Sequence, residues 1–322
     1  MKSFKEYSKI VNEIIEGLDY SNSRPSNLYE PITYALKGGG KHLRPILLLA
    51  FADAFGADIS TLNNVAVAIE MFHNFTLVHD DIMDNSDTRH GKPAVWKLWG
   101  VPTAVLAGDM MLTVSDILIT SPSYMSDAMK LEMLSAFHLT AVKVYRGQQY
   151  DIDFDSSDKD VLIDDYLMMI GLKTSALLGG ACHLGAVAAQ ASGKSKTLAY
   201  EYGYQLGMAF QLQDDLLDTF GDPDTFGKPI GGDILNDKKT WLYITAKQEA
   251  PERMVEALKL NGQAKIDAVR AIYQDLDLPA RCQERINYYT NKAIGYAKDS
   301  DMKPEAVEFF TNLATSLIGR AK

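Results

Sequence analysis

The sequence predicts an all-α protein, and three observations lead to this prediction. Apolar residues recur at the three-to-four-residue spacing of one helix face, most clearly over 65–84. The sustained period-two alternation of a half-buried strand is missing. Proline, which interrupts helices, is absent from residues 46–92 and 123–222, so long helices are expected in both intervals.

The same periodicity places the elements in chain order. Helices are expected over 65–84, 104–118, 127–150, 161–191, 198–220, 238–249 and 284–298. In the first of them, Val65, Ile69 and Phe72 occupy successive turns of one face. Loops are expected around 85–93, 153–160 and 221–232. No Pro-, Gly- or Ser-rich linker divides the chain, which favours a single helical domain over residues 1–322.

Composition limits the class of protein. The 322 residues are 47% hydrophobic and 23% charged, which is typical of a soluble globular protein. The net charge is −10, with 42 acidic and 32 basic residues, which argues against a nucleic-acid partner or an anionic-membrane patch. Cys182 and Cys282 form no metal-type cluster, which indicates a reducing compartment. Charged residues interrupt residues 1–18 and no stretch reaches about 18 apolar residues, so we expect a cytoplasmic protein without stable membrane insertion.

Two acidic motifs are the strongest indication of chemistry. Asp80-Asp81-Ile82-Met83-Asp84 and Asp214-Asp215-Leu216-Leu217-Asp218 both spell Asp-Asp-x-x-Asp. Positions i and i+4 share one helix face, so the outer aspartates of each motif form a carboxylate pair. Carboxylates about 4 Å apart repel by roughly 4 kcal/mol at an effective dielectric of about 20, and a divalent cation relieves that repulsion.

The surroundings of the motifs decide between two interpretations. A single copy is more simply explained as a solvated charged face, but two copies among large apolar residues favour metal binding. Two carboxylate pairs that face each other would make a cage for Mg²⁺. This ion prefers oxygen ligands and is usually completed by the phosphates of a substrate, so a diphosphate substrate is implied.

Basic residues follow a glycine run and both acidic motifs. The run Gly-Gly-Gly-Lys-His-Leu-Arg-Pro places Lys41 and Arg44 at the start of an apolar helix, where they could bind an anion. Its spacing excludes a nucleotide P-loop, and a purely structural turn is the alternative. Arg89 follows the first motif, and Lys228 and Lys238 follow the second, at positions that suit contacts with a bound diphosphate.

Three further features are weaker. His73 and His79 lie on the helix of the first motif, and neither has partners at the spacing of a zinc site. His73 is a candidate ligand of a second anion, whereas His79 is interpreted as a hydrogen-bonded, partly buried side chain. Residues 151–155, Asp-Ile-Asp-Phe-Asp, resemble the start of a calcium loop but lack its glycine and closing glutamate, so they are interpreted as a solvated acidic loop.

Taken together, these motifs resemble those of the trans-isoprenyl diphosphate synthases, also called polyprenyl synthetases. The ordered set extends over 38–240 and comprises Gly-Gly-Lys-x-x-Arg-Pro, His73, the first Asp motif, Arg89-His90-Gly91, Gly147-Gln148, Lys173-Thr174, Phe210-Gln211 before the second Asp motif, and Gly227-Lys228 through Lys238. The resemblance implies an all-α fold, namely a single large helical bundle of the terpenoid-synthase type with a central cavity. It also implies a homodimer, because members of the family usually form one.

The resemblance further implies residue roles. Mg²⁺, with three ions per active site, is implied to bind at Asp80, Asp84, Asp214, Asp215 and Asp218, with Asp81 supporting the cage. The allylic diphosphate is implied to contact Arg89, Lys173, Lys228 and Lys238, and Thr174 and Gln211 to lie beside the developing cation. Isopentenyl diphosphate is implied to contact Lys41, Arg44 and His73, and also His90, where the family often has a second Arg. The implied catalytic residues are Asp81, Lys173, Thr174 and Gln211.

The implied reaction is a Mg²⁺-dependent condensation of an allylic diphosphate with isopentenyl diphosphate. Breaking the allylic C–O bond leaves a delocalised cation and a diphosphate anion, so metals and fixed cations stabilise the leaving group while apolar walls exclude water. The isopentenyl double bond then attacks the cation, and a proton is lost. Two alternatives are a class I terpene cyclase, which usually has a different second metal motif, and a noncatalytic regulatory subunit, which would be expected to lose part of an Asp motif.

Bulky side chains on the helix of the first motif predict the product length. Phe75 lies five residues before Asp80, about 7.5 Å along the axis at ~1.5 Å per residue, and Phe72 lies about 12 Å away. Phe75 with Thr76 resembles the short-chain geranylgeranyl type. We therefore expect a C20 product, with C15 as the alternative.

Overall fold

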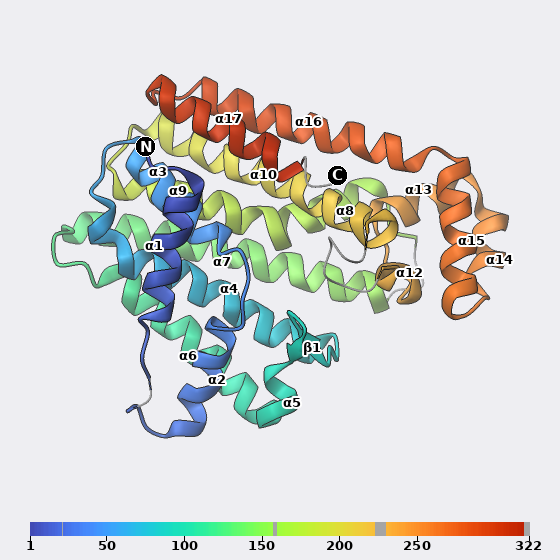
Figure 1. Cartoon of the computed structure of the whole chain (residues 1–322), viewed down its shortest axis with the longest axis horizontal. Coiled ribbons are helices and arrows are strands. Elements are labelled where there is room, and N and C mark those ends of the chain that lie inside the picture. The colour runs from blue at the N-terminus through green and yellow to red at the C-terminus, as the bar shows by residue number, and fades with distance from the viewer. Residues whose placement is uncertain (21, 157–159, 223–229, 319–322) are drawn as a thin grey trace. The chain divides into compact units, whose positions relative to one another are not determined.

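Helices make up almost all of the regular structure in the computed structural model, which describes residues 1–20, 22–156, 160–222 and 230–318 (Figure 1). The helices are α1 (Phe4–Glu16), α2 (Ser26–Leu36), α3 (Leu43–Ala54), α4 (Asn63–Met83), α5 (Val95–Trp99), α6 (Val101–Thr120), α7 (Asp127–Ser156), α8 (Ile163–Ile170), α9 (Ala176–Ala188), α10 (Gly193–Phe220), α12 (Gly232–Leu235), α13 (Trp241–Glu249), α14 (Pro251–Leu258), α15 (Gly262–Asp275), α16 (Leu278–Lys298) and α17 (Pro304–Ile318). A 3₁₀ turn η1 (Ile59–Leu62), a π-helical turn η2 (Gly171–Ser175) and the short strands β1 (Thr88–Arg89) and β2 (Lys92–Pro93) complete the elements. The prediction of an all-α fold is confirmed.

The chain divides into two compact units, each assembled from separate segments. Unit 1 comprises Met1–His138 and Ala181–Thr197, and unit 2 comprises Leu139–Gly180 and Leu198–Lys322. Unit 1 carries the first Asp motif and unit 2 the second. That residues 1–322 form one domain and that the two motifs face each other remain predictions.

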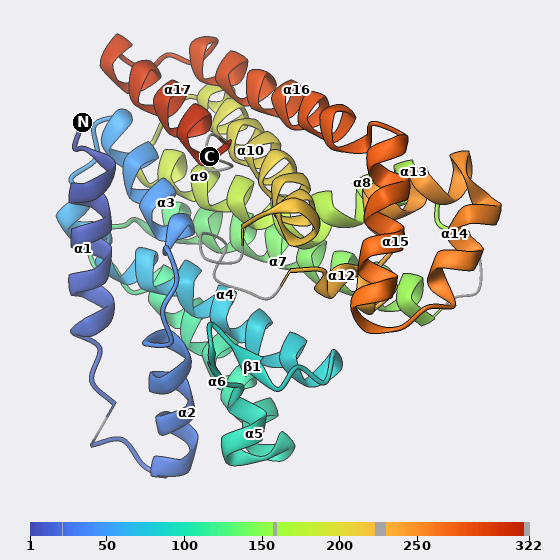
Figure 2. The same ribbon diagram turned by 45° about the vertical axis from the view of Figure 1, so that its right-hand side comes forward.

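The core of unit 1 forms around α3 and α4. Residues 45–52 of α3 are all buried, as expected for a helix enclosed by others. α4 packs against α2, α3 and α6, and Figure 2 shows α4 and α6 side by side. Gly108 of α6 permits this approach, because a Cβ atom there would lie 2.2 Å from Nε2 of His79. This packing determines where the last turn of α4, which carries the first motif, lies within unit 1.

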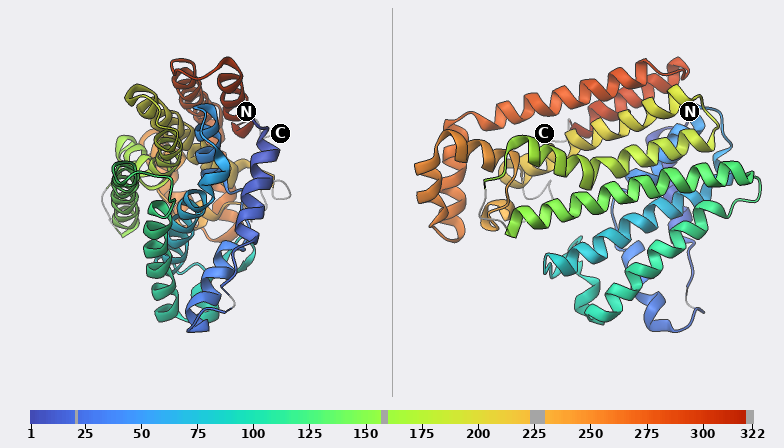
Figure 3. Two further views of the ribbon diagram at one scale, coloured as in Figure 1. Left: turned by 90° about the vertical axis from the view of Figure 1, so that its left-hand side faces the viewer. Right: turned by 180° about the vertical axis from the view of Figure 1, so that it is seen from behind.

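Unit 2 contains α10 and the helices that follow it. α16 and α17 pack as an antiparallel pair (Figure 3). Tyr202 of α10 fixes α17, because its hydroxyl donates to the Phe310 carbonyl at 2.8 Å and the two rings meet edge to face. Gly207 lets α10 approach η2, since a Cβ atom there would lie 2.5 Å from Cα of Ser175. The second motif is therefore carried by a helix that is packed along its length.

Several helix boundaries differ from the prediction; α10 and α16 begin earlier than predicted, at Gly193 and Leu278, and two further differences bear on the site. The helix predicted over 127–150 continues to Ser156 in α7. The prediction ended too early because the last turn of this helix is acidic and lacks the apolar spacing by which a helix is recognised in sequence. The helix predicted over 161–191 is observed as α8 and α9 joined by the π-helical turn η2. Most of the loop predicted over 221–232 lies outside the described residues.

Two helical stretches are long and apolar enough to cross a membrane by length and composition alone. They are Val101–Thr120 and the continuous stretch Ile163–Ala188. This is weak evidence, because buried core helices pass the same test, and 67% of the second window is buried. The expectation that no stretch reaches about 18 apolar residues therefore holds only if charged residues such as Asp109 and Asp116 count as interruptions.

Candidate active site

The first Asp motif occupies the C-terminal end of α4. Asp80 and Asp81 lie in the last turn, and Asp84 caps the helix, which ends there because Asn85 is left-handed with φ of 51°. Asp84 is exposed, whereas Asp81 is buried. The helix dipole adds partial negative charge at this end and increases the repulsion among the carboxylates. The end of α4 is therefore a favourable place for a cation.

A hairpin after α4 brings Arg89 back to the motif. Its turn residues His90 and Gly91 have φ of 52° and 74°, as a two-residue type I′ turn requires, so the loop predicted over 85–93 contains β1 and β2. Nε and Nη2 of Arg89 donate to Oδ1 of Asp81 at 2.9 and 2.5 Å, and Nη2 lies 3.8 Å from Oδ2 of Asp80. Burial raises the pKa of Asp81, and Arg89 opposes this rise through its hydrogen bonds and charge.

The glycine run forms the turn that leads into α3. The two glycines before Lys41 have φ of 105° and 124°, a region that glycine occupies readily, and His42 follows with φ of 44°. Lys41 is exposed, and Arg44 is half-buried in the first turn of α3. Burial lowers the pKa of Arg44 to about 10, and the Glu70 carboxylate opposes this change.

His73 of α4 lies in a positively charged environment within unit 1. Burial lowers the pKa of His73 well below its usual value, and the charges of Arg44, Arg89, His90 and His42 lower it further. The imidazole is therefore neutral at pH 7 and can both donate and accept a hydrogen bond. The structure thus brings together most of the basic residues predicted to contact substrate in unit 1, and their converging positive charge suits an anion.

Aromatic rings line the face of α4 that precedes the motif. Phe72 is fully buried and its ring lies 5.5 Å from that of Phe75 and 5.0 Å from that of Phe137 in α7, between centroids. Phe75 meets His79 edge to face at 4.8 Å, and Nε2 of His79 lies 3.1 Å from a carbonyl oxygen of α6, which confirms its interpretation as a hydrogen-bonded side chain. Thr76 donates to a carbonyl of its own helix at 2.7 Å. Phe72 and Phe75 are thus part of one packed cluster in unit 1, and Thr76 lies on the same helix.

The second Asp motif lies near the C-terminal end of α10 in unit 2. Asp214 and Asp218 are partly exposed and one turn apart, whereas Asp215 is buried. Oδ1 of Asp215 accepts a hydrogen bond from Nε2 of Gln211 at 3.0 Å, and Oδ2 accepts one from the hydroxyl of Tyr166. Burial raises the pKa of Asp215 to about 7. The middle carboxylate of this motif is therefore bonded to uncharged donors.

Lys173 and Thr174 lie in η2, and π-helical turns are frequent at functional sites. A Cβ atom at Gly147 of α7 would lie 2.2 Å from the backbone nitrogen of Lys173, so only glycine permits this contact between α7 and the turn. Oγ1 of Thr174 donates to Oε1 of Gln211 at 3.0 Å, and Gln211 donates to Asp215. Thr174 and Gln211, which are both expected beside the developing cation, therefore form one hydrogen-bonded chain with Asp215, which is expected to bind metal.

The interpretation of residues 151–155 as a solvated acidic loop is wrong in two respects, because the segment continues helix α7 and Asp151 is buried, although Asp153 and Asp155 are exposed. Asp151 is a buried residue of α7, and its Oδ2 lies 2.5 Å from Nζ of Lys173. Burial raises the pKa of Asp155, and the charge of Asp151 adds to this rise. The signal that could have located these residues is the i, i+4 spacing from Gly147 to Asp151 and Asp155.

Lys238 lies among carboxylates of unit 2. Burial lowers its pKa, but Asp233 and Asp215, with other carboxylates, raise it by more. Nζ of Lys238 lies 3.7 Å from Oδ1 of Asp233, whose backbone N–H donates to Oδ2 of Asp218 at 2.9 Å. This bond ties α12 to the second motif. Lys228, for which a similar role is predicted, lies outside the described residues.

The donor atoms of both motifs fit Mg²⁺. Among the residues that the structure describes, no group of three or more His, Cys, Asp or Glu side chains is arranged as a complete metal site. The outer aspartates of each motif are at least partly exposed, and the middle ones are bonded to protein groups. A pair of partly exposed carboxylates matches the way Mg²⁺ binds, through one or two carboxylates, waters and substrate phosphates.

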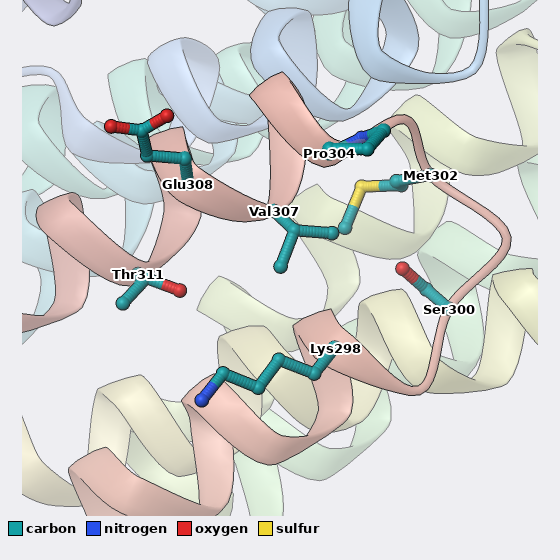
Figure 4. A pocket seen from close by; sticks show the side chains of 7 residues that line it. All are labelled: Lys298, Ser300, Met302, Pro304, Val307, Glu308 and Thr311. Atoms are coloured by element: carbon teal, nitrogen blue, oxygen red, sulfur yellow. The ribbon is translucent and has the colours of Figure 1, made fainter.

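An open hollow of about 470 Å³ lies elsewhere in unit 2 (Figure 4). Its lining comes from the end of α16, the start of α17 and the residues between them, including Lys298, Met302 and Val307. None of the predicted site residues lines it. It is therefore a surface feature distinct from the candidate active site.

Comparison with known proteins identifies the family. The polyprenyl synthetase family model matches residues 25–276, more than half of the chain. The chain belongs to the polyprenyl synthetase family. It is similar to the geranylgeranyl pyrophosphate synthase of Geoglobus acetivorans, with 39% identity over 321 residues and coverage of 98% of both chains.

Solved structures agree with this assignment. This polyprenyl synthetase superposes on a crystal structure of a geranylgeranyl pyrophosphate synthase with a TM-score of 0.92, 37% identity and full coverage of both chains. The polyprenyl synthase of Caulobacter crescentus CB15, solved with calcium and isoprenyl diphosphate, gives a TM-score of 0.84 at 27% identity and covers 99% of this chain and 96% of its own. The chain is a trans-prenyltransferase with the all-α isoprenoid synthase fold. The two alternatives, a class I terpene cyclase and a noncatalytic regulatory subunit, are not favoured.

Proposed function

We propose that this polyprenyl synthetase adds isopentenyl diphosphate to an allylic diphosphate and makes the C20 product, geranylgeranyl diphosphate. The observation that carries the proposal is the anion site of unit 1, where the charges of Arg44, Arg89 and His90 act on a neutral His73 and lower its pKa. A terpene cyclase has a single diphosphate substrate and needs no second anion site. The site thus supports a condensation of two diphosphates, with Lys41 as a further contact to isopentenyl diphosphate.

The roles of the residues in unit 2 follow from the charge that develops on ionisation. Mg²⁺ held by the outer aspartates of the two motifs would neutralise the leaving diphosphate. Lys238, which neighbouring carboxylates keep protonated, adds fixed positive charge. Lys173 would leave its ion pair with Asp151 and form one with the diphosphate. The oxygen atoms of Thr174 and Gln211, held by their mutual hydrogen bond, lie at a fixed position that suits stabilisation of the allylic cation.

The number of metal ions is part of the proposal. We take it as three per active site from the family resemblance, and the donor set of two Asp pairs supports more than one. Calorimetric titration of the protein with Mg²⁺ in the presence of a non-hydrolysable allylic diphosphate analogue counts the ions. A stoichiometry of one ion per chain would contradict this number.

The C20 product is supported by the aromatic cluster on α4. Phe75 is 7% exposed and packed between Phe72 and His79, so it cannot move aside without disturbing unit 1. Such a fixed ring limits the length of the prenyl tail. The similar geranylgeranyl pyrophosphate synthase of Geoglobus acetivorans supports the same length.

A homodimer is supported by the exposed apolar surface of unit 1. Leu106 and Ile117 of α6 are each 60% exposed and Leu131 of α7 is 70% exposed. The two helices are neighbours, because Nε2 of His138 lies 2.9 Å from Oδ1 of Asp116. A second copy that covers this face would bury these side chains, as interfaces of homodimers do. Light scattering of the parent and of Ile117→Asp tests this, and a parent protein that is monomeric at micromolar concentration would contradict it.

One assay tests the activity and the product together. The protein is incubated with isopentenyl diphosphate and, separately, the C5, C10 and C15 allylic diphosphates, with Mg²⁺ or with a chelator. We expect C20 diphosphate from every starter and no turnover with chelator. A cyclic hydrocarbon formed without isopentenyl diphosphate would overturn the proposal. A cytoplasmic location remains a prediction from composition.

A further inference from the structure

Glu70 is a buried carboxylate beside the anion site that has no role in the reaction described so far. It lies on α4, ten residues before Asp80, and its side chain is 6% exposed. Its Oε1 lies 2.9 Å from Nδ1 of His42 and accepts a weaker hydrogen bond from Nδ2 of Asn74 at 3.3 Å. One oxygen of this carboxylate is thus bonded to the turn that carries Lys41.

The other oxygen of Glu70 is unpaired. Among the residues that the structure describes, Oε2 of Glu70 and Nε of Arg44 are both buried without a hydrogen-bond partner. They are an acceptor and a donor of opposite charge on helices that pack together, and Glu70 is the group whose charge raises the pKa of Arg44 against the effect of burial. Two complementary buried groups left unpaired are costly, so their persistence requires a compensating role.

Stability alone does not explain a carboxylate at this position. Its neighbours Ile69, Met71 and Phe72 are fully buried and apolar. A buried charge has a large desolvation penalty, and an apolar residue of similar volume is often equally or more stable. A glutamate at position 70 is therefore better explained by a functional role than by a contribution to stability.

We propose that Glu70 is a positioning residue for the isopentenyl diphosphate site. It holds His42, and with it the turn before α3, and it directs Nε of Arg44 inward so that the two terminal nitrogens of the guanidinium face the diphosphate. A guanidinium can serve both partners because it carries five donors in a fixed planar arrangement. This inference rests on the proposed function, in which Arg44 binds isopentenyl diphosphate.

The test compares Glu70→Gln with Arg44→Lys. For Glu70→Gln we expect KM for isopentenyl diphosphate to rise about tenfold, with KM for the allylic substrate unchanged within about twofold, because the negative charge that acts on Arg44 is lost and the bond to His42 is weakened. Glu13→Gln, which changes an exposed carboxylate of α1, is the matched control and should alter neither constant. Parallel thermal unfolding shows whether each variant is folded. A Glu70→Gln variant whose two KM values change equally, or not at all, would overturn the inference.

Arg44→Lys separates this inference from the proposed function. If Arg44→Lys raises KM for isopentenyl diphosphate and Glu70→Gln does not, the anion site stands and the role of Glu70 falls. If Arg44→Lys leaves that KM unchanged, the anion site is misassigned and both fall. The double variant should raise KM for isopentenyl diphosphate by less than the product of the two single effects, since Glu70 acts in part through Arg44, whereas independent effects that multiply would contradict the coupling.

His42→Gln provides a second route if Glu70→Gln does not fold. It removes the bond to Oε1 from the opposite side and leaves the carboxylate in place. We expect a smaller rise, about threefold, in KM for isopentenyl diphosphate alone. An unchanged KM in a folded His42→Gln variant would contradict the role of Glu70 in holding this turn.

Discussion

The two Asp-Asp-x-x-Asp motifs share a sequence pattern but have different partners. In each, the middle aspartate is buried and hydrogen-bonded within its own unit. Asp81 accepts two hydrogen bonds from the guanidinium of Arg89, a cation. Asp215 accepts its hydrogen bonds from Gln211 and Tyr166, which are uncharged. Burial raises the pKa of both carboxyls, and a positive charge opposes the rise at each. Arg89 acts on Asp81 through hydrogen bonds and charge, whereas Lys238 acts on Asp215 through its charge and is countered there by the Asp233 carboxylate.

The difference shows that a motif does not specify the charge of its members. The pKa of Asp215 is about 7, so the second motif loses part of its negative charge as the pH falls through neutrality. Arg89 favours the ionised form of Asp81, so the first motif keeps its charge to lower pH. The middle aspartate of the first motif is therefore hydrogen-bonded to a cation, whereas that of the second is hydrogen-bonded to neutral groups and is also influenced by the charge of Lys238.

The largest effect is expected from Asp81→Ala, which breaks the cationic partnership. The change leaves Arg89 without its main partner and lets it pair with Asp80, whose Oδ2 already lies 3.8 Å away. We expect kcat to fall about 1,000-fold, about 4 kcal/mol in activation free energy, because both a carboxylate and the placement of Arg89 are lost. Steady-state kinetics and thermal unfolding measure the two consequences. A folded variant that retains kcat within about tenfold would remove the assigned role of Asp81.

Asp215→Ala is expected to lower kcat less than Asp81→Ala does, and this difference tests the contrast between the two motifs. It leaves two neutral donors unpaired rather than a guanidinium, and Gln211 keeps its bond to Thr174. We expect kcat to fall about 10-fold to 100-fold. Asp164→Ala, which changes an exposed aspartate of α8, serves as the control and should have parent kinetics. If Asp215→Ala and Asp81→Ala lose the same activity, the two motifs do not differ in the way the partners indicate.

The aromatic residues of the two units provide a second contrast. Phe75→Ala removes a ring packed in unit 1, and we expect products longer by at least one C5 unit because the tail gains room. Tyr204→Phe in unit 2 keeps a ring that is stacked on Tyr200 and should leave the product length unchanged. Chromatography of the dephosphorylated products decides between these outcomes. A C20 product from Phe75→Ala would place the limit on chain length elsewhere.

The smallest expected effect is on stability and depends on pH. The folded pKa of Asp215 is about 7 and its unfolded value is about 3.9, so between these values the folded state binds the extra proton and its stability falls as pH rises. Asp215→Asn has no charge to bury. We expect its melting temperature, measured with chelator, to exceed that of the parent by about 3 °C near pH 8 and to match it near pH 4. Asp81→Asn should not gain stability, because Arg89 loses its partner. A gain for Asp215→Asn that is independent of pH would contradict the raised pKa.

The fold and the two motifs could be predicted from sequence because both depend on local spacing. Helical periodicity located α4, α6 and α10 within a few residues, and the i, i+4 rule placed the outer aspartates of each motif on one helix face. The aromatic residues Phe72 and Phe75 were located for the same reason. Their roles in the reaction remain predictions, as does Lys228, which lies outside the described residues.

Several residues of the candidate site could not be predicted because their partners are distant in sequence. Tyr166 bonds Asp215 across 49 residues, and Asp151 bonds Lys173 across 22. Nothing in the acidic run around Asp151 distinguishes a solvated loop from a buried helical turn, since the distinction depends on which helix packs against it. Glu70 was missed because a single acidic residue in an apolar stretch has no periodic pattern.

The sequence by itself determined several of the long helices, the faces that carry the carboxylate pairs and the family, since each of these depends on residues within a few turns of one another or on their order. Only the tertiary structure decided which carboxylates are ionised. Burial and nearby charges set the pKa of Asp81 and Asp215, and both depend on side chains that meet only after the helices have packed.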